Sequence, residues 1–132
     1  MLVFGGNLAY TAATMKNNDT TTTVQELNDR FFAYSQARGW DAGYEPSFLA
    51  KSVIIEAAEL LEHFQKSDGE SAMRKMQDTE SKREVAWEMV DVMYYLLMLA
   101  RTLNIDITSV ASDKLKELAT RYPAKTVSKA TK

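Results

Sequence analysis

The stretch from Val85 to Ala100, VAWEMVDVMYYLLMLA, most constrains how this chain can fold. Its only charged side chains are Glu88 and Asp91, and apolar residues would occupy every face of a helix. A helix that is apolar all round is expected to be buried. An ionised carboxylate inside a protein is costly unless it is paired or bound to a metal. Because the stretch holds no lysine or arginine, the two acids need partners from elsewhere in the chain.

Composition narrows the class of protein. The 132 residues suffice for one domain with a core. A net charge of −2 gives no general attraction to nucleic acid or to an anionic membrane. There is no cysteine, which excludes disulfides and thiolate chemistry. The N-terminus lacks the basic start and long apolar core of a signal peptide. We therefore expect a cytoplasmic protein with no nucleic-acid or membrane partner.

The hydrophobic pattern predicts an all-α protein, a four- to five-helix bundle with short connections. Thr23 and Glu26 form a capping-box pattern that opens the first helix, and Thr108 is expected to cap the last one. The expected helices cover residues 24–37, 46–66, 71–76, 79–103 and 108–121. Around this helical domain, residues 23–123, we expect a flexible leader over residues 1–22 and a basic flexible tail over residues 124–132.

A second pair of acids also lies in an apolar segment that is expected to be helical. Glu56 and Glu59 lie in an apolar segment and are three residues apart, as are Glu88 and Asp91. Residues at this spacing lie on one side of a helix, one turn apart. Two such helices packed side by side would bring four carboxylates together, which requires cations. An all-oxygen, highly charged site is the kind that Mg²⁺, or Mn²⁺, prefers.

Other interpretations of the acids remain open. Glu-x-x-Glu on a helix is common, and most instances are solvated surface. A ferritin-type di-iron site needs two Glu-x-x-His motifs, but His63 is the only histidine, and residue 60 is Leu60. The sequence has neither a Walker A loop nor a glycine-rich phosphate cradle. If phosphates bind here, metal ions rather than backbone amides would have to hold them.

Three strings carry a family resemblance: IIEAAELLEHFQ, then EVAWEMVDVMYYLLMLARTLNIDI, then KLKELATRYP. In this order they resemble the MazG-like all-α nucleoside triphosphate pyrophosphohydrolases, in particular the short single-domain type that includes the dCTP pyrophosphatases. The resemblance covers residues 24–123. It implies cleavage of a (deoxy)nucleoside triphosphate to the monophosphate and pyrophosphate, which removes unwanted nucleotides from the pool. It also implies a homodimer or homotetramer with sites formed between helices of different subunits.

The same resemblance implies roles for individual residues. The Mg²⁺ ligands would be Glu56, Glu59, Glu88 and Asp91, with Glu59 also orienting or deprotonating the attacking water. The substrate would be contacted by Trp40 at the base, by Tyr95 and Lys114 at the phosphates, and by Tyr122. From the residues alone, Trp40 and Tyr95 could equally be packing residues, and Lys114 a surface lysine.

This chain departs from the family pattern at three positions. Leu118 stands where an asparagine is usual, Lys66 where a tryptophan often follows Phe-Gln, and Phe48 where the usual Pro-Lys-Asn opening ends. These departures leave base preference open. Leu118 and Lys66 favour one alternative, a non-catalytic nucleotide-binding or helical interaction module related to the family. A structural oligomer with a buried acidic cluster is a third hypothesis, under which Mg²⁺ would not raise the melting temperature.

Overall fold

A computed structural model describes residues 18–124, and the predicted all-α class is confirmed. The described residues hold no strand. Five α-helices follow a hydrogen-bonded turn at residues 18–22, with the short 3₁₀ helix η1 after the first of them. Their bounds are α1 Val24–Gln36, η1 Asp41–Gly43, α2 Pro46–Glu62, α3 Gly69–Lys75, α4 Thr79–Thr102 and α5 Ile107–Arg121. The predicted leader and tail fall mostly outside the described residues.

Side-chain caps explain where the helices begin. The predicted capping box is present, since the Thr23 hydroxyl accepts from the Glu26 backbone N–H and the Glu26 carboxylate accepts from the Thr23 backbone N–H. Asp106 caps α5 by accepting from the Ser109 backbone N–H at 2.8 Å. The prediction that Thr108 caps this helix is therefore wrong. An aspartate two residues earlier supplies the oxygen.

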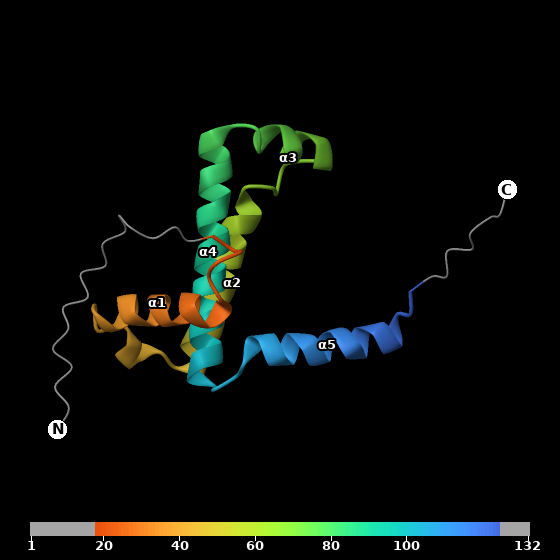
Figure 1. Cartoon of the computed structure of the whole chain (residues 1–132). Helices are drawn as coiled ribbons and strands as arrows, with labels where there is room; N and C mark the ends of the chain where they lie inside the picture. Colours follow the sequence, from red (N-terminus) through yellow and green to blue (C-terminus); the bar gives the residue numbers. More distant parts are fainter. Residues whose placement is uncertain (1–17, 125–132) are drawn as a thin grey trace, which may run out of the picture.

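Helix α2 ends at Glu62, earlier than the predicted end near residue 66. The chain then passes through turns to α3, which joins α2 to α4 at the far end of the pair (Figure 1). The Lys75 ammonium donates to the His63 backbone carbonyl at 3.1 Å. A lysine at the C-terminus of a helix satisfies a carbonyl that has no partner within the helix, so α3 stabilises the early end of α2.

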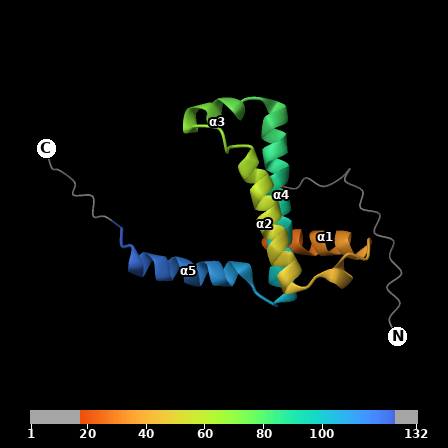
Figure 2. The same ribbon diagram turned by 180° about the vertical axis from the view of Figure 1, so that it is seen from behind.

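Helices α2 and α4 lie side by side along most of their lengths, and α1 crosses α4 near its C-terminal end (Figures 1 and 2). The Arg101 guanidinium joins α4 to α1 by an ion pair with Asp29 at 2.7 Å. The Asn28 side chain donates to the Leu97 carbonyl at 3.1 Å. The core lies at this crossing, where Leu49 and Met98 are fully buried. The predicted acidic helices are thereby held next to each other.

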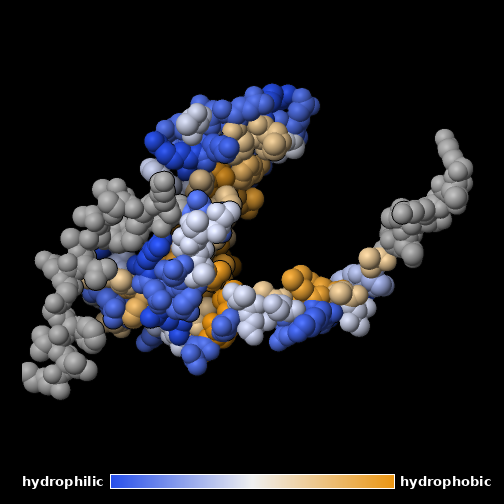
Figure 3. Space-filling view, viewed as in Figure 1, coloured by the Kyte–Doolittle hydropathy of each residue, from blue (hydrophilic) through white to orange (hydrophobic). Residues whose placement is uncertain are grey.

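Much apolar surface is left uncovered in the single chain. The expectation that the Val85–Ala100 stretch is buried on all sides is wrong for one chain, since Trp87 is 59% exposed and Met89 56%. Apolar surface also lines both sides of the hollow between the α2–α4 pair and α5 (Figure 3). Within the described residues α5 buries none of its side chains and points away from the other helices. One copy alone therefore gives this domain only a small core.

Three hydroxyl groups, which we call the hydroxyl cluster, join α1, α4 and the loop before α2. They belong to Ser35, Tyr44 and Tyr94. The Tyr94 hydroxyl lies 2.5 Å from the Tyr44 hydroxyl and is also hydrogen bonded to the Ser35 hydroxyl. The Ser35 hydroxyl in turn donates to the Phe31 carbonyl at 2.9 Å. Burial raises the pKa of Tyr94 well above its ordinary value of 10.0. Tyr94 therefore stays neutral and can donate, and the chain of bonds leaves each hydroxyl satisfied.

Replacing Tyr94 by phenylalanine should lower the free energy of unfolding by about 1 kcal/mol. The change removes the central hydroxyl of the hydroxyl cluster and the hydrogen bonds it makes, while Tyr44 and Ser35, 3.2 Å apart, can still pair. Urea denaturation of the purified protein measures the change. Tyr122→Phe is the matched control because Tyr122 is 69% exposed. Equal stability of the two variants would contradict a structural role for the Tyr94 hydroxyl.

Candidate functional site

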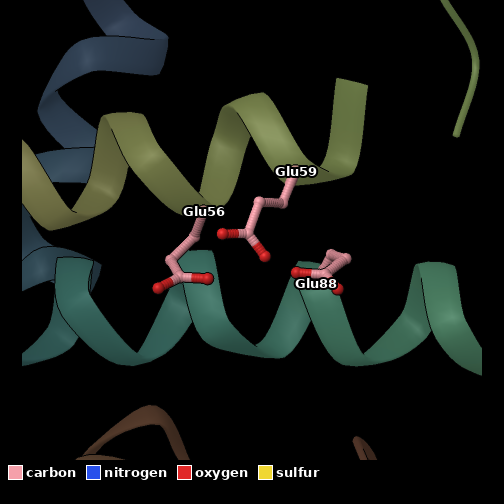
Figure 4. Close-up of side chains that lie close together, drawn as sticks. All are labelled: Glu56, Glu59 and Glu88. Atoms are coloured by element: carbon pink, nitrogen blue, oxygen red, sulfur yellow. The ribbon is translucent and has the colours of Figure 1, made fainter. Parts of the chain in front are cut away.

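The two predicted acidic pairs face each other across the α2–α4 pair. Glu56 and Glu59 extend from α2 toward α4, where Glu88 lies opposite them (Figure 4). One carboxylate oxygen from each of these three residues lies within 4.8 Å of the others. The spacing of three places Glu56 and Glu59 on the same side of α2, and the packing of α2 on α4 adds the third acid. We call these three residues the acidic cluster.

Electrostatic repulsion acts on the acidic cluster. Burial raises the pKa of Glu56 above its ordinary value of 4.5, and the negative charges of Glu59, Asp91 and Glu88 raise it further. Asp91 lies outside the group whose oxygens come within 4.8 Å, yet its charge acts on Glu56. All four predicted ligands therefore belong to one electrostatic unit.

A pocket of about 750 Å³ opens beside the acidic cluster, between α1 and α4. Glu56 and Asp91 form its acidic side. Its other walls are mainly aromatic and apolar, with one arginine. They comprise Leu27, Arg30, Phe31, Tyr34, Trp40, Val90, Tyr94 and Tyr95. An apolar pocket with a few convergent polar groups is the usual form of a small-molecule site, and this volume falls in the range for such ligands.

Two of the predicted substrate residues line this pocket. Burial raises the pKa of Tyr95 above its ordinary 10.0, and the charges of Glu56 and Asp91 raise it further. Its hydroxyl therefore stays protonated beside the carboxylates. Trp40 is 52% exposed and packs edge-on against Tyr34, with ring centroids 5.9 Å apart. Its position is fixed by the turn that ends α1, where Gly39 adopts φ of 69° and the Trp40 N–H donates to the Ser35 carbonyl.

The other two predicted substrate residues lie elsewhere. Lys114 is on α5, where its ammonium pairs with Glu117 at 2.6 Å. Tyr122 follows the end of α5 and is 69% exposed. Because α5 points away from the α2–α4 pair, the single chain does not bring these two residues to the pocket.

Sequence reasoning missed the wall contributed by α1. Arg30, Phe31 and Tyr34 share one side of this helix with Leu27, at spacings of three, four and seven. Leu27, Phe31 and Tyr34 read from the sequence as an ordinary core stripe. The available signal was Arg30, a charged residue placed within an apolar stripe.

The donor set of the acidic cluster fits a hard divalent cation. It offers only carboxylate oxygens, from three residues close enough to share an ion, and Mg²⁺ and Mn²⁺ prefer such ligands. The repulsion that raises the pKa of Glu56 is the force a bound cation would relieve. Within residues 18–124 no lysine or arginine forms an ion pair with these three acids.

Replacing Glu56 by glutamine should stabilise the metal-free protein. Like charges one turn apart cost about 0.5 kcal/mol, which corresponds to a rise of roughly 2–4 °C in melting temperature. Because the pKa of Glu56 is raised on folding, the native state binds more protons than the unfolded state. Wild-type stability from this group therefore increases as pH falls through the raised pKa toward 4.5.

That pH dependence should be weaker in Glu56→Gln, and the stabilisation by Mg²⁺ should shrink with it. Melting curves between pH 4.5 and 7 with a chelator or with Mg²⁺ measure both effects. Glu62→Gln is the control, since Glu62 is exposed on the same helix. A lower melting temperature for metal-free Glu56→Gln than for the wild type would contradict the repulsion.

The fold and site define an all-helical protein with carboxylates facing across a helix pair, next to an aromatic pocket. A family model described as MazG-like matches residues 51–132, more than half of the chain. The chain belongs to the MazG-like family, as the order of its acidic motifs predicted.

The chain is also similar to named proteins at low sequence identity. The chain is 28% identical to dCTP pyrophosphatase 1 of Rattus norvegicus over 102 residues and to that of Homo sapiens over 103 residues. These matches cover 76% and 77% of this chain but 59% and 60% of the relatives, so the chain spans about three fifths of their length. A solved pyrophosphatase from Archaeoglobus fulgidus superposes with a TM-score of 0.72 at 29% identity, covering 84% of this chain and 100% of that one.

Among the described residues, no helix has the length and apolar character needed to cross a membrane. The longest, α4, carries acids and bases along its first half.

Proposed function

We propose that this protein is a divalent-metal-dependent nucleoside triphosphate pyrophosphohydrolase. The observation that carries the proposal is the acidic cluster next to the aromatic pocket, which Glu56 of the cluster lines together with Asp91. Carboxylates that repel one another can bind divalent cations, and these cations can bind the phosphates of a nucleotide. The aromatic rings can stack on its base. Relatives named dCTP pyrophosphatase 1 support a deoxynucleoside triphosphate as substrate.

In the proposed reaction, water attacks the α-phosphorus and the bond from the α-phosphorus to the bridging oxygen breaks. The products are a nucleoside monophosphate and pyrophosphate. Glu56, Glu59, Glu88 and Asp91 would hold Mg²⁺, which supplies charge neutralisation of the phosphates and a lower pKa for the water. The Glu59 carboxylate accepts the proton of the water, the Tyr95 hydroxyl donates to a phosphate oxygen, and the Trp40 ring stacks on the base.

A second copy of the chain completes the proposed site. Uncovered apolar surface on α2, α4 and α5 supports this assembly, and its most exposed large residues include Ile54, Leu61, Trp87, Met89, Val110 and Leu115. Lys114 and Tyr122 are out of reach of their own pocket, so α5 of a neighbouring copy would bring them to it. A homodimer or homotetramer would bury this surface.

A panel of nucleoside triphosphates tests the proposed activity. Each nucleotide is incubated with the protein and Mg²⁺, and pyrophosphate and monophosphate are measured. We expect both products in equal amounts from at least one nucleotide, and none when a chelator replaces Mg²⁺. Absence of turnover across ribo- and deoxyribonucleotides would overturn the proposal. Calorimetry would then test the alternative of a binding module, which the replacements Lys66 and Leu118 favour.

A further inference from the structure

One charged side chain that lines the pocket makes no hydrogen bond or ion pair with any residue between 18 and 124. Arg30 is half-buried and lines the pocket from α1. Within residues 18–124 it is the single arginine without an ion pair, a hydrogen bond or a ring contact to a described residue. Among the described residues, its positive charge helps to lower the pKa of Glu26, to which the two hydrogen bonds donated by Thr23 contribute more. A half-buried guanidinium has five N–H donors to satisfy.

The nearby arginine Arg38 is committed elsewhere. Its guanidinium lies 3.3 Å from the centre of the Tyr34 ring and donates to the Tyr34 carbonyl at 3.0 Å. The Arg38 guanidinium therefore packs against both rings of the aromatic pair formed by Tyr34 and Trp40. Arg30 is thus the pocket cation whose donors remain available to a ligand.

The arrangement of the pocket indicates which part of a ligand Arg30 meets. The acids come from α2 and α4, so they define the phosphate end. Arg30 stands one turn from Tyr34 on the same side of α1, and Tyr34 packs against Trp40. The arginine therefore belongs to the aromatic end, where a base would stack. A planar fork of donors beside a stacked base recognises two neighbouring acceptors on the edge of that base.

We propose that Arg30 determines base specificity by donating two parallel hydrogen bonds to a base edge with adjacent acceptors. Cytosine presents such an edge at O2 and N3, and guanine presents one at O6 and N7. Uracil and thymine carry the N3–H donor between their two carbonyl acceptors, and adenine carries its N6 amino donor next to N1 and N7. None of these three bases offers two neighbouring acceptors, so none can accept both bonds. This inference rests on the proposed function, because it assigns the base end of the same site.

Substrate competition with Arg30 variants tests this role. The wild-type protein should favour cytosine or guanine triphosphates over uracil and adenine triphosphates by about tenfold to a hundredfold in kcat/KM, the discrimination of one bidentate pair. Both Arg30→Gln and Arg30→Lys should abolish the preference, because lysine keeps the charge but lacks the fork. Arg74→Gln is the control, since Arg74 pairs with Glu70 on α3, far from the pocket.

Other outcomes would overturn the role. If Arg30→Lys restores the wild-type pattern while Arg30→Gln weakens every triphosphate equally, the arginine binds phosphate. If both variants only lower the melting temperature and keep the preference, its role is structural. Calorimetric binding of the same nucleotides separates this inference from the proposed activity. If the protein binds cytosine and guanine triphosphates preferentially but hydrolyses none, the role of Arg30 is supported and the proposed hydrolase activity is wrong. If it hydrolyses triphosphates without a base preference, only the proposed role of Arg30 is wrong.

Discussion

Replacing Glu88 by glutamine is expected to abolish pyrophosphate release, with a loss of about a thousandfold or more in kcat. Glu88 is the member of the acidic cluster that α4 contributes opposite Glu56 and Glu59. The amide keeps the shape of the side chain but removes one of the negative charges that would hold a cation. Loss of a metal that stabilises the reacting phosphate removes several kcal/mol of barrier lowering, about tenfold for each 1.4 kcal/mol.

The matched control is Glu84→Gln, one turn earlier on the same helix. Glu84 is exposed and lies outside the acidic cluster, so its loss should change activity by less than about twofold. Circular dichroism must show that both variants keep their helices. The two variants should also differ in metal-induced stabilisation, because only Glu88→Gln weakens the cation site. Equal activity of Glu88→Gln and Glu84→Gln would refute a metal site at the acidic cluster.

The second large effect concerns assembly. Replacing Leu115 by glutamate should dissociate the proposed oligomer into 14.9 kDa monomers. Leu115 is 67% exposed on α5 in the single chain, and burying such a side chain contributes about 1.5–3 kcal/mol. Placing a charge in the interface adds a desolvation cost. The dissociation constant should therefore rise by about a hundredfold or more, as measured by sedimentation or light scattering.

Activity should fall with the oligomer, because in the proposed assembly each site takes Lys114 and Tyr122 from a neighbouring copy. Lys116→Gln is the control on the polar side of α5, where Lys116 pairs with Asp113 and is well exposed. Mixing the Glu88→Gln protein with a Lys114→Ala protein tests the shared site directly. Partial recovery of activity in the mixture is expected if one copy supplies the acids and another the lysine. A wild-type protein that stays monomeric while active would contradict the shared site.

The acidic site was predictable because its signal lies within single helices. Glu56 and Glu59, like Glu88 and Asp91, follow a fixed spacing within apolar segments, and helical geometry alone places each pair on one side. The pocket was less predictable. Its α1 wall depends on how α1 crosses α4, which Asp29, Arg101 and Asn28 determine through contacts about 70 residues apart in sequence.

Helix ends and burial show the same contrast between features that local sequence predicts and features that depend on distant contacts. Thr23 and Glu26 announce the start of α1 locally, so the capping box was found from the sequence. The cap of α5 was misplaced because Asp106 and Thr108 are both acceptable capping residues, and only the folded backbone brings the Ser109 N–H to the Asp106 carboxylate. The apolar run in α4 predicted burial, but it cannot specify whether the covering surface belongs to the same chain.

The sequence by itself determined the helical class and the two acidic pairs, because both follow from residue spacing along one helix. It also determined the family, through the order of those motifs. Only the tertiary structure decided that Glu88 meets Glu56 and Glu59, that Tyr95 and Trp40 share a pocket with Arg30, and that Lys114 lies apart from it. The reason is physical: packing angles between helices depend on many distant side chains acting together, whereas helical periodicity depends on neighbours.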